Sequence, residues 1–437
     1  MHDVVVIGAG PGGSAAAYYL ARRGLDVLLL DKADFPRDKT CGDGLTPRAV
    51  SVLQDMGLAD DLRRIGHVIR RFEVFAPNGR STGDAIILSD VPSPTPRRRP
   101  EAGEAGIKRR AASRNGEGEA EQASDALPDY ALVVPRLQLD DRIRQQAVRA
   151  GARFAPGVRV DDIRIERLNG AERVEVKGEH NGRRTSFQAR LAVIATGANV
   201  ALLLRSGLLT HQPKAMVAAR AYFQGVRGLS DAWTLRFDSA PLPGYGWVFP
   251  IASDAANIGV GYFKRDRAAS ALGPFQSFVR SPAIQALLAD ARQAGPIKGY
   301  PLRDDFLTSP TFGRRMLLVG EAAGLVNPLT GEGIDYALES GRIAAAHAFE
   351  MFADGDFTWQ QHAAYDQTLR SRFQALFEFC TWVRDHCANR ITLNVLVAAA
   401  NHRRDLRQRL MRVVLGGAAI HGKLTIGRVL RALVGRR

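Results

Sequence analysis

Residues 4–13 read Val-Val-Val-Ile-Gly-Ala-Gly-Pro-Gly-Gly, an apolar run followed at once by glycines. The run predicts a buried strand, and the alanine-rich residues 14–23 predict a helix that ends before Gly24. Glycines at such a turn let the backbone approach a pyrophosphate at the helix N-terminus. The first candidate binding residues are therefore Gly8, Gly10 and Gly13.

An acidic residue follows the next predicted strand. The apolar run over residues 26–30 ends at Asp31, 18 residues after Gly13, where a carboxylate is placed to accept hydrogen bonds from a ribose hydroxyl. Lys32 follows directly and joins the candidate set. Because strand, glycines, helix, strand and acid occur in this order, the sequence predicts a Rossmann-type dinucleotide-binding unit.

A second motif lies at residues 316–334, which read Met-Leu-Leu-Val-Gly-Glu-Ala-Ala-Gly-Leu-Val-Asn-Pro-Leu-Thr-Gly-Glu-Gly-Ile. A carboxylate at the end of its strand can hold ribityl hydroxyls, and the N-terminus of the helix that follows can face a flavin edge that becomes negative on reduction. The pattern resembles the second FAD motif of the para-hydroxybenzoate hydroxylase-like flavoproteins, which usually has Asp at the position of Glu321. The candidate FAD contacts here are Glu321, Gly331, Gly333 and Ile334.

The chain has no second Gly-x-Gly-x-x-Gly between a strand and a helix, so we expect no dedicated NAD domain. Electrons must then come from an external donor, either a transiently docked nicotinamide such as NADPH or a small redox protein.

Three further stretches narrow the chemistry. Residues 35–45 contain Cys41-Gly42-Asp43-Gly44, and residues 133–140 contain Pro135-Arg136, with Arg136 available to a phosphate or ribose at the start of a helix. Residues 245–250 read Tyr-Gly-Trp-Val-Phe-Pro, followed by Gly259-Val260-Gly261. Alternating aromatic residues on a strand point one way, so Tyr245, Trp247 and Phe249 form either a flat apolar wall or part of an ordinary core.

Together these residues resemble the geranylgeranyl reductase family of FAD enzymes, whose substrate-domain signature is Tyr-x-Trp-x-Phe-Pro, a short gap and Gly-x-Gly. Residues 39–45 and 327–336 are most similar to its bacterial menaquinone reductase branch. The resemblance implies an FAD cofactor, a prenyl-lipid substrate and a position for Cys41 and Gly42 beside the flavin. Pro250 belongs to the same signature and joins the substrate-binding set.

One stretch departs from the superfamily pattern. Relatives often carry Ala-Asp-Gly where this chain has Ala195-Thr196-Gly197, so the glycine turn at Gly197 remains while the Asp is absent. In hydroxylase relatives that Asp belongs to a motif linked to FAD and NADPH handling. The electron donor therefore stays open.

The resemblance implies saturation of an isolated C=C bond in a prenyl chain, of menaquinone or a geranylgeranyl-type lipid. Such a bond needs hydride from reduced flavin, a positioned acid and exclusion of water. An apolar tunnel supplies binding at roughly 0.8 kcal/mol per buried CH₂. Cys41, as proton relay or packing group, and Tyr245 and Trp247, as tunnel wall, are the candidate catalytic residues.

Two other classes of function stay open at this stage. A flavin monooxygenase that hydroxylates an aromatic ring would consume oxygen and NADPH. A non-catalytic electron-transfer flavoprotein would reoxidise its flavin without forming a product.

The expected architecture is α/β: a discontinuous Rossmann-type FAD-binding domain, an inserted β-rich substrate domain and C-terminal helices. We assign residues 1–75, 130–205 and 300–346 to the FAD-binding domain, 76–90 and 206–300 to the substrate domain, 91–128 to a disordered insertion and 347–437 to a basic helical region. The insertion is expected to be disordered because it has few large apolar residues to offset its ordering entropy.

Charge is concentrated at the C-terminus. The chain has 60 Lys and Arg against 45 Asp and Glu, a net charge of +15, and residues 401–437 carry ten bases and one acid. This basic amphipathic stretch predicts either contact with an anionic membrane or a solvated face of helices that cover the core. No nucleic-acid motif accompanies it, so we expect no nucleic-acid partner.

The three cysteines, Cys41, Cys380 and Cys387, fit a reducing compartment better than a disulfide framework. Cys380, His386 and Cys387 are interpreted as part of a helix rather than as metal ligands. No apolar run reaches the ~18 residues of a membrane span, and no basic leader is evident. We therefore expect a cytoplasmic protein, with peripheral contact at the inner face of the membrane as an option.

Overall fold

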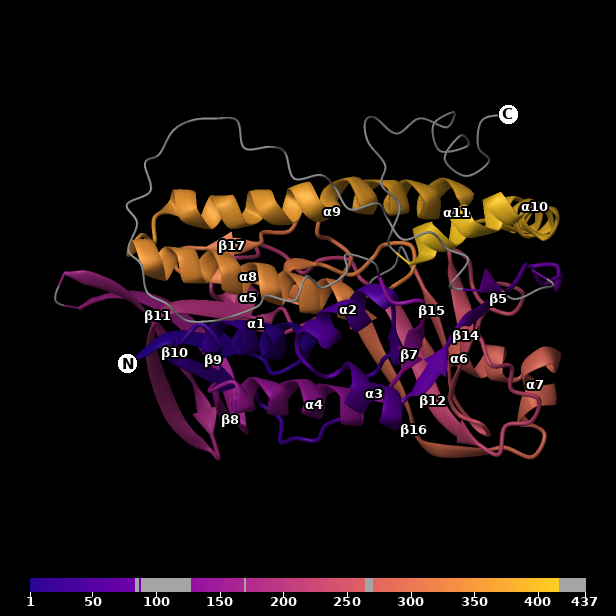
Figure 1. Cartoon of the computed structure of the whole chain (residues 1–437), viewed down its shortest axis with the longest axis horizontal. Helices are drawn as coiled ribbons and strands as arrows, with labels where there is room; N and C mark the ends of the chain where they lie inside the picture. The colour runs from indigo at the N-terminus through magenta and orange to yellow at the C-terminus, as the bar shows by residue number, and fades with distance from the viewer. Residues whose placement is uncertain (83–85, 88–126, 169, 264–269, 416–437) are drawn as a thin grey trace, which may run out of the picture.

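The computed structural model describes residues 1–82, 86–87, 127–168, 170–263 and 270–415 (Figure 1). Nearly all of the insertion expected at residues 91–128 lies outside these described residues, and so do residues 416–437 of the basic C-terminal region.

The first sheet has eight strands and is built around the N-terminal strand, which lies between two parallel neighbours. The path β17-β18-β11-β1-β2-β8 carries an antiparallel extension, in which β10 pairs with β11 and β9 pairs with β10. The strands are β1 (His2–Ile7), β2 (Val27–Leu30), β8 (Arg153–Ala155), β9 (Val158–Leu168), β10 (Ala171–His180), β11 (Arg183–Ile194), β17 (Phe312–Gly313) and β18 (Met316–Leu318). The α/β class expected from the sequence is confirmed.

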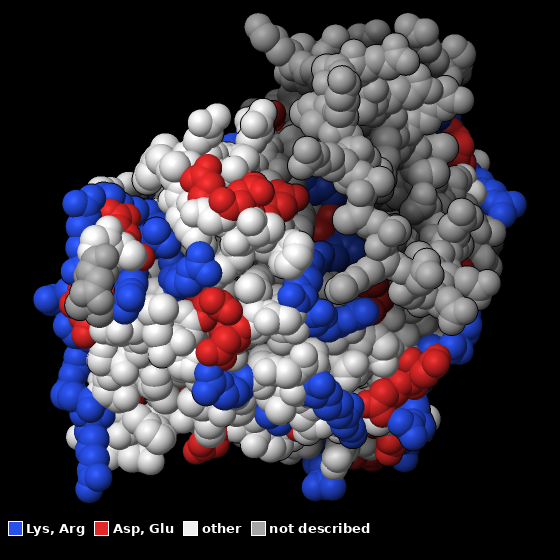
Figure 2. All heavy atoms as spheres, turned by 60° about the vertical axis from the view of Figure 1, so that its left-hand side comes forward, with Lys and Arg blue, Asp and Glu red and all other residues white. Residues whose placement is uncertain are grey.

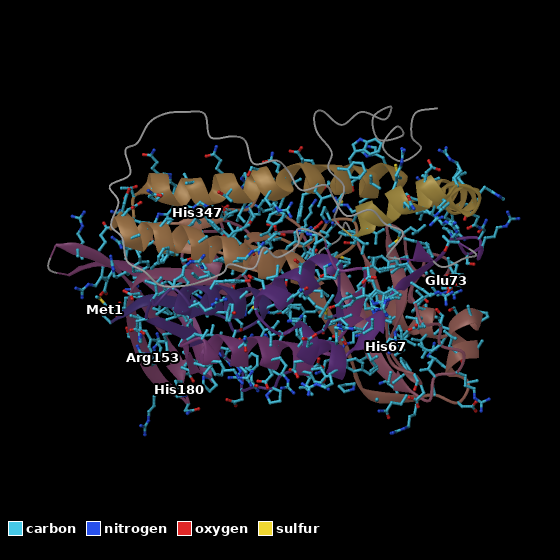
Figure 3. All side chains as sticks on the ribbon, viewed as in Figure 1. Met1, His67, Glu73, Arg153, His180 and His347 are labelled. Carbon is cyan, nitrogen blue, oxygen red and sulfur yellow. The ribbon has the colours of Figure 1, made fainter. Side chains whose placement is uncertain are left out.

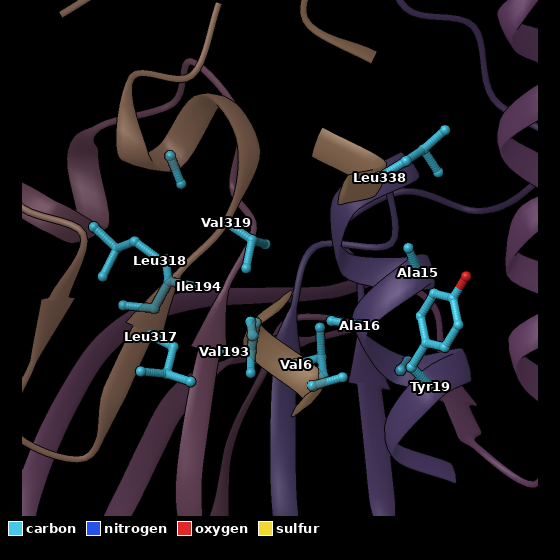
Figure 4. Close-up of a cluster of buried hydrophobic side chains, with 14 of the residues drawn as sticks. Val6, Ala15, Ala16, Tyr19, Val193, Ile194, Leu317, Leu318, Val319 and Leu338 are labelled. Atoms are coloured by element: carbon cyan, nitrogen blue, oxygen red, sulfur yellow. The ribbon is translucent and has the colours of Figure 1, made fainter. Parts of the chain in front are cut away.

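Helices cover this sheet in layers. In Figure 1, α9 (Trp359–Cys387) lies above α8 (Ile334–Asp354), α8 above α1 (Pro11–Ala21), and α4 (Arg136–Arg149) lies on the lower side. The alanine face of α1 allows this close packing: Ala15 and Ala16 are fully buried near Val6 of β1 (Figure 4). The core therefore holds the glycine turn between β1 and α1 rigidly in place.

The second sheet has seven strands in the order β16-β12-β15-β14-β13-β5-β6. They are β5 (Arg71–Phe75), β6 (Ile86–Ile87), β12 (Met216–Gln224), β13 (Trp233–Arg236), β14 (Gly244–Ala252), β15 (Ala255–Tyr262) and β16 (Arg292–Leu302), with helices α6 (Leu272–Val279) and α7 (Pro282–Leu288) beside them. The sequence analysis drew its first boundary after residue 75. Because β5 pairs with β13, that strand belongs to the second sheet instead.

A small three-stranded sheet uses strands that alternate along the chain with those of the two larger sheets, and it brings residue 44 next to residue 133. Its strands are β3 (Gly44–Leu45), β4 (His67–Ile69) and β7 (Ala131–Val133), and the remaining short helices are α2 (Pro47–Asp55), α3 (Ala59–Ile65), α5 (Ala201–Arg205) and the 3₁₀ turn η2 (Gly320–Ala323). Figure 3 labels Met1, Arg153 and His180 at the end formed by the first sheet, His67 and Glu73 toward the end formed by the second, and His347 on α8. The two large sheets thus form the two ends of the molecule.

The C-terminal helices α10 (Arg390–His402) and α11 (Arg404–Val414) differ in how they use their apolar residues. Leu406 and Met411 of α11 are each 1% exposed, and Met411 packs in a cluster with Phe72 of β5. The apolar face of α11 therefore covers the core, as the second interpretation of the basic region expected. On α10, Ile391 and Val395 remain 77% and 62% exposed.

Charges elsewhere on the surface are mixed. The end of the molecule that carries β9–β11 comes forward in Figure 2 and shows basic and acidic side chains interspersed. Close ion pairs such as Arg184–Asp161 at 2.5 Å belong to this extension. Within the described part of the chain, no helix is both long and apolar enough to cross a bilayer.

Candidate active site

A cavity of about 890 Å³ is lined by residues from both large sheets. The β1–α1 turn, the segment 37–44, strand β14 and the N-terminus of α8 all contribute to its wall. The sequence-predicted residues that line it are Gly8, Gly10, Asp31, Lys32, Cys41, Gly42, Arg136, Gly197, Tyr245, Trp247, Phe249, Glu321, Gly331, Gly333 and Ile334. The fold thus brings both FAD motifs and the aromatic strand to one cavity.

Two predicted residues lie away from this cavity. A Cβ added at Gly13 would lie 1.8 Å from the carbonyl oxygen of Gly8, so Gly13 serves close packing of helix against strand. Pro250 alternates with Phe249 on β14 and therefore points to the opposite face of the sheet, the face on which Val248 enters a second core cluster. Pro250 is therefore not among the residues that line the cavity.

The first motif forms a polar cradle. The Asp31 carboxylate accepts hydrogen bonds from the backbone N–H groups of Ala9 at 2.7 Å and Ala33 at 2.9 Å, which fix it at the end of β2. Thr196 also lines the cavity, and its buried Oγ1 has no partner among the described residues. A rigid acid, unobstructed glycine backbone and an unpaired hydroxyl suit a ligand that brings its own hydroxyls and phosphates, as FAD does.

The second motif contributes a paired carboxylate. Glu321 Oε2 lies 3.1 Å from Lys39 Nζ, and Oε1 accepts the backbone N–H of Arg303 at 3.0 Å. Glu321 follows β18 and lines the cavity, so the side chain, longer by one methylene than Asp, still presents a carboxylate there. The residues of both motifs fit the cofactor.

Arg136 is held differently from the sequence expectation. Its guanidinium is 4% exposed and makes two bonds to the carboxylate of Asp140, at 2.6 and 2.7 Å. Because Asp140 lies one helical turn along α4, the pair is intrahelical and buried. Arg136 lines the cavity paired with Asp140, but the same carboxylate also pairs with Arg37 at 2.9 Å, so the three side chains together keep one net positive charge at the cavity wall.

Tyr245, Trp247 and Phe249 share one face of β14, with neighbouring ring centroids 6.2 Å apart. Trp233 of β13 stacks on Phe249 at 5.0 Å and supports this wall from the next strand. The Tyr245 hydroxyl donates to the carbonyl of Thr330 in the second FAD motif. The aromatic wall is thus tied directly to the loop before α8.

A buried polar node, which the sequence analysis missed, lies behind Cys41. Asp43 is fully buried and accepts hydrogen bonds from the Tyr222 hydroxyl at 2.6 Å and from Asn257 Nδ2 at 2.8 Å. Asn257 Nδ2 also donates to the Cys41 carbonyl, and its Oδ1 accepts from Trp247 Nε1 at 3.0 Å. Asp43, Tyr222 and Asn257 therefore link the loop at Cys41 to the aromatic wall.

The electrostatics of this node follow from its burial. Burial raises the pKa of Asp43 to about 6, against the opposing hydrogen bonds from Tyr222 and Asn257. Burial likewise raises the pKa of the Cys41 thiol to about 11, although the nearby charge of Arg136 opposes the shift. Cys41 therefore lines the cavity as a neutral thiol.

A second residue without an expected role is Glu332, which lies between two glycines of the second motif and lines the cavity. Its Oε1 accepts backbone N–H groups at the start of α8, from Gly333 at 3.1 Å and from Ile334 at 2.9 Å. Burial, with a smaller contribution from the charge of Asp335, raises its pKa to about 8. An acid flanked by two glycines was the only sequence signal for it.

The cysteines and histidine of α9 do not gather around a site. Cys380 is buried in the core, while His386 stacks on Trp382. Among the described residues, no group of three or more His, Cys, Asp or Glu could hold a metal ion.

Comparison with known proteins places these observations in a family. A family described as "FAD binding domain" matches residues 1–380. The chain is 35% identical to a menaquinone reductase of Mycobacterium tuberculosis over 356 residues, covering 78% of this chain and 75% of the relative. It is 29% identical to a digeranylgeranylglycerophospholipid reductase of Methanopyrus kandleri over 386 residues, covering 86% and 88%.

A solved structure shares the fold. The geranylgeranyl bacteriochlorophyll reductase-like protein of Thermoplasma acidophilum superposes with a TM-score of 0.73 at 22% identity, covering 99% of this chain and 96% of the other.

Proposed function

The chain belongs to the geranylgeranyl reductase family of FAD-dependent oxidoreductases, and from that premise we propose that it saturates C=C bonds in the prenyl chain of menaquinone or a geranylgeranyl-type lipid. The observation that carries the proposal is the aromatic wall of Tyr245, Trp247 and Phe249, which shares one cavity with both FAD motifs. A flat apolar wall beside a hydride donor suits an isoprenoid chain, because each buried CH₂ contributes roughly 0.8 kcal/mol to binding.

Reduced FAD, when bound, supplies the hydride. The chain's own residues then have three tasks. The Asp31 and Glu321 carboxylates accept hydrogen bonds from hydroxyl groups of the cofactor. The aromatic wall positions the alkene and excludes water. A side chain in the cavity holds the proton for the second carbon.

Anaerobic turnover tests the proposal against its two rivals. Chemically reduced holoenzyme, mixed without oxygen with a menaquinone or a geranylgeranyl lipid, should yield a product heavier by two hydrogens per reduced bond. An aromatic monooxygenase would form no product without oxygen. An electron-transfer flavoprotein would reoxidise its flavin and reduce at most a quinone head to the quinol, which returns to the starting mass on reoxidation in air, whereas a saturated C=C bond keeps its two added hydrogens. Either of those results would overturn the proposal.

We also propose that α10 forms the contact with an anionic membrane. Ile391 and Val395 lie one helical turn apart and are exposed, and the basic Arg390 precedes them. Because the apolar face of α11 packs on the core, α10 is better placed than α11 to contact a membrane surface within the described chain. Replacing Ile391 and Val395 by Ser should weaken binding to vesicles of anionic phospholipid while leaving the bound FAD in place; unchanged vesicle binding would contradict this contact.

A further inference from the structure

Three proton-bearing side chains of the cavity wall lie close enough to affect one another's protonation. They are Cys41 from the segment before β3, Tyr245 from β14 and Glu332 from the loop before α8. The charge of Glu332 would raise the pKa of both neighbours. Reduction of a C=C bond needs one proton besides the hydride, so one member of this cluster is placed to deliver it.

The three groups differ in how readily they release a proton. Tyr245 already donates its hydroxyl hydrogen to the Thr330 carbonyl, and burial raises its pKa. The Cys41 thiol has a pKa of about 11, whereas the Glu332 carboxyl has a pKa of about 8. The lower pKa makes Glu332 the stronger acid of the two, and it lies nearer the ambient pH.

The other carboxylates of the cavity wall are engaged elsewhere. Asp31 accepts two backbone N–H groups at the end of β2. Asp38 pairs with Arg220 at 2.6 Å and Lys298 at 2.7 Å, and Glu321 pairs with Lys39. A cation beside a carboxylate favours its ionised form, so Asp38 is not suited to hold a proton, and the Glu321 carboxylate is already engaged by Lys39 and by the backbone of Arg303.

The geometry of Glu332 fixes its carboxyl in the cavity wall. Oε1 accepts the N–H groups of Gly333 and Ile334 at the start of α8, which sets the orientation of the carboxyl. The backbone N–H of Asp335 is a further donor to this carboxyl, so its neutral form is held in place beside the aromatic wall and both FAD motifs. The titratable groups that face it are the Asp335 carboxyl on α8 and the neutral Cys41 thiol and Tyr245 hydroxyl on the neighbouring elements.

We propose that Glu332 is the catalytic acid that protonates the prenyl double bond, an assignment that rests on the proposed function. Reduced FAD, when bound, would supply the hydride, which carries both electrons of the first new C–H bond. The π electron pair forms the second C–H bond with the proton of the Glu332 carboxyl, and the O–H electrons remain on the carboxylate. Water would then reprotonate Glu332, and the external donor, a nicotinamide or a small redox protein, would restore the reduced cofactor.

The test is a single turnover of chemically reduced holoenzyme with the prenyl lipid, followed by flavin reoxidation without oxygen. In wild-type protein the rate should fall as the pH rises through about 8, where Glu332 loses its proton. Glu332→Gln keeps the N–H contacts but carries no acidic proton, so its rate should fall about a hundredfold or more and lose this pH dependence. Glu332→Asp, which keeps a carboxyl, should recover part of the rate.

A spectroscopic readout separates an acid from a structural residue. The infrared band of a protonated carboxyl, taken as wild-type minus Glu332→Gln on oxidised holoenzyme, should vanish as the pH rises through about 8. A Glu332→Gln enzyme that turns over at the wild-type rate, that lacks bound FAD, or that gives no such difference band would overturn the assignment. Failure of wild-type enzyme to reduce any prenyl lipid would instead overturn the proposed function.

Discussion

Two loops of the cavity wall are built on opposite principles. The turn Gly8–Gly13 relies on the absence of side chains: the backbone of Gly13 lies so near Gly8 that a Cβ would fall 1.8 Å from its carbonyl oxygen. The loop Cys41–Gly44 relies on a buried residue, Asp43, whose φ is 65°. Its carboxylate accepts hydrogen bonds from side chains on two strands of the second large sheet, β12 and β15. The first loop is fixed by steric fit and the second by hydrogen bonds, so they should respond differently to substitution and to pH.

Gly13→Ala should give the largest effect. The added methyl cannot be accommodated without moving β1 or α1, so we expect a loss of about 3 kcal/mol in the free energy of unfolding, together with loss of bound FAD. Thermal unfolding and the flavin content of the purified protein measure both. Gly12→Ala is the matched control: its Cβ would lie 3.1 Å from the Ala337 carbonyl oxygen. It should stay within about 1 kcal/mol of wild type. Equal stability of the two variants would show that close packing does not fix this turn.

Asp43→Asn tests the second loop through pH. The folded-state pKa of Asp43, about 6, is above the unfolded value of about 3.9, so the fold prefers the protonated carboxyl. Its contribution to stability is therefore present below about pH 4 and is lost as the pH rises through about 6, by about 3 kcal/mol. The stability difference between wild type and Asp43→Asn should fall across this window, because other carboxyls titrate in both proteins. A difference that is flat with pH, in urea unfolding, would contradict the burial argument.

The same contrast explains what the sequence could predict. The unit β1-α1-β2 could be predicted because its pattern of apolar residues, its glycines and its terminal acid all lie within residues 2–31. The node at Asp43 could not, because its partners Tyr222 and Asn257 lie some 180 and 210 positions further along the chain. For Asn257, the only local signal was that it is a polar residue inside the apolar run of β15. Likewise the position of β5 in the second sheet could not be predicted from residues near 75, because its parallel partner β13 is distant in the chain.

Pairing also decided which predicted residues reach the cavity. Alternation along β14 placed Tyr245, Trp247 and Phe249 on one face, as expected, and the same alternation removed Pro250. Arg136 was predicted to be an unpaired cation, although its partner Asp140, four residues further along the predicted helix, could have been identified from the sequence. The pKa of Glu332 could not be predicted from the sequence, because it depends on burial that arises only when the cavity is assembled.

Tyr245→Phe sharpens the comparison where the aromatic wall meets the second FAD motif. The ring remains while the hydrogen bond to the Thr330 carbonyl is lost, so we expect a loss of about 1 kcal/mol in stability. Tyr300→Phe is the control, since Tyr300 also lines the cavity and its hydroxyl makes no hydrogen bond within the described residues. Thermal unfolding of both variants measures the effect, and equal melting temperatures would mean that this bond does not tie the two motifs together.

Cys41→Ser should have the smallest effect. Cys41 contributes its backbone carbonyl to the Asn257 amide, and this contact survives replacement of the thiol by a hydroxyl. The side chain is a neutral thiol with a pKa of about 11, a weaker acid than Glu332 in the same cavity. Loss of a proton relay would slow prenyl reduction about a hundredfold or more, whereas a packing role predicts a change below about threefold. We expect the smaller change in anaerobic single turnover. A hundredfold loss in Cys41→Ser, with FAD still bound, would transfer the acid role from Glu332 to Cys41 and place the chemistry in the hydrogen-bonded loop.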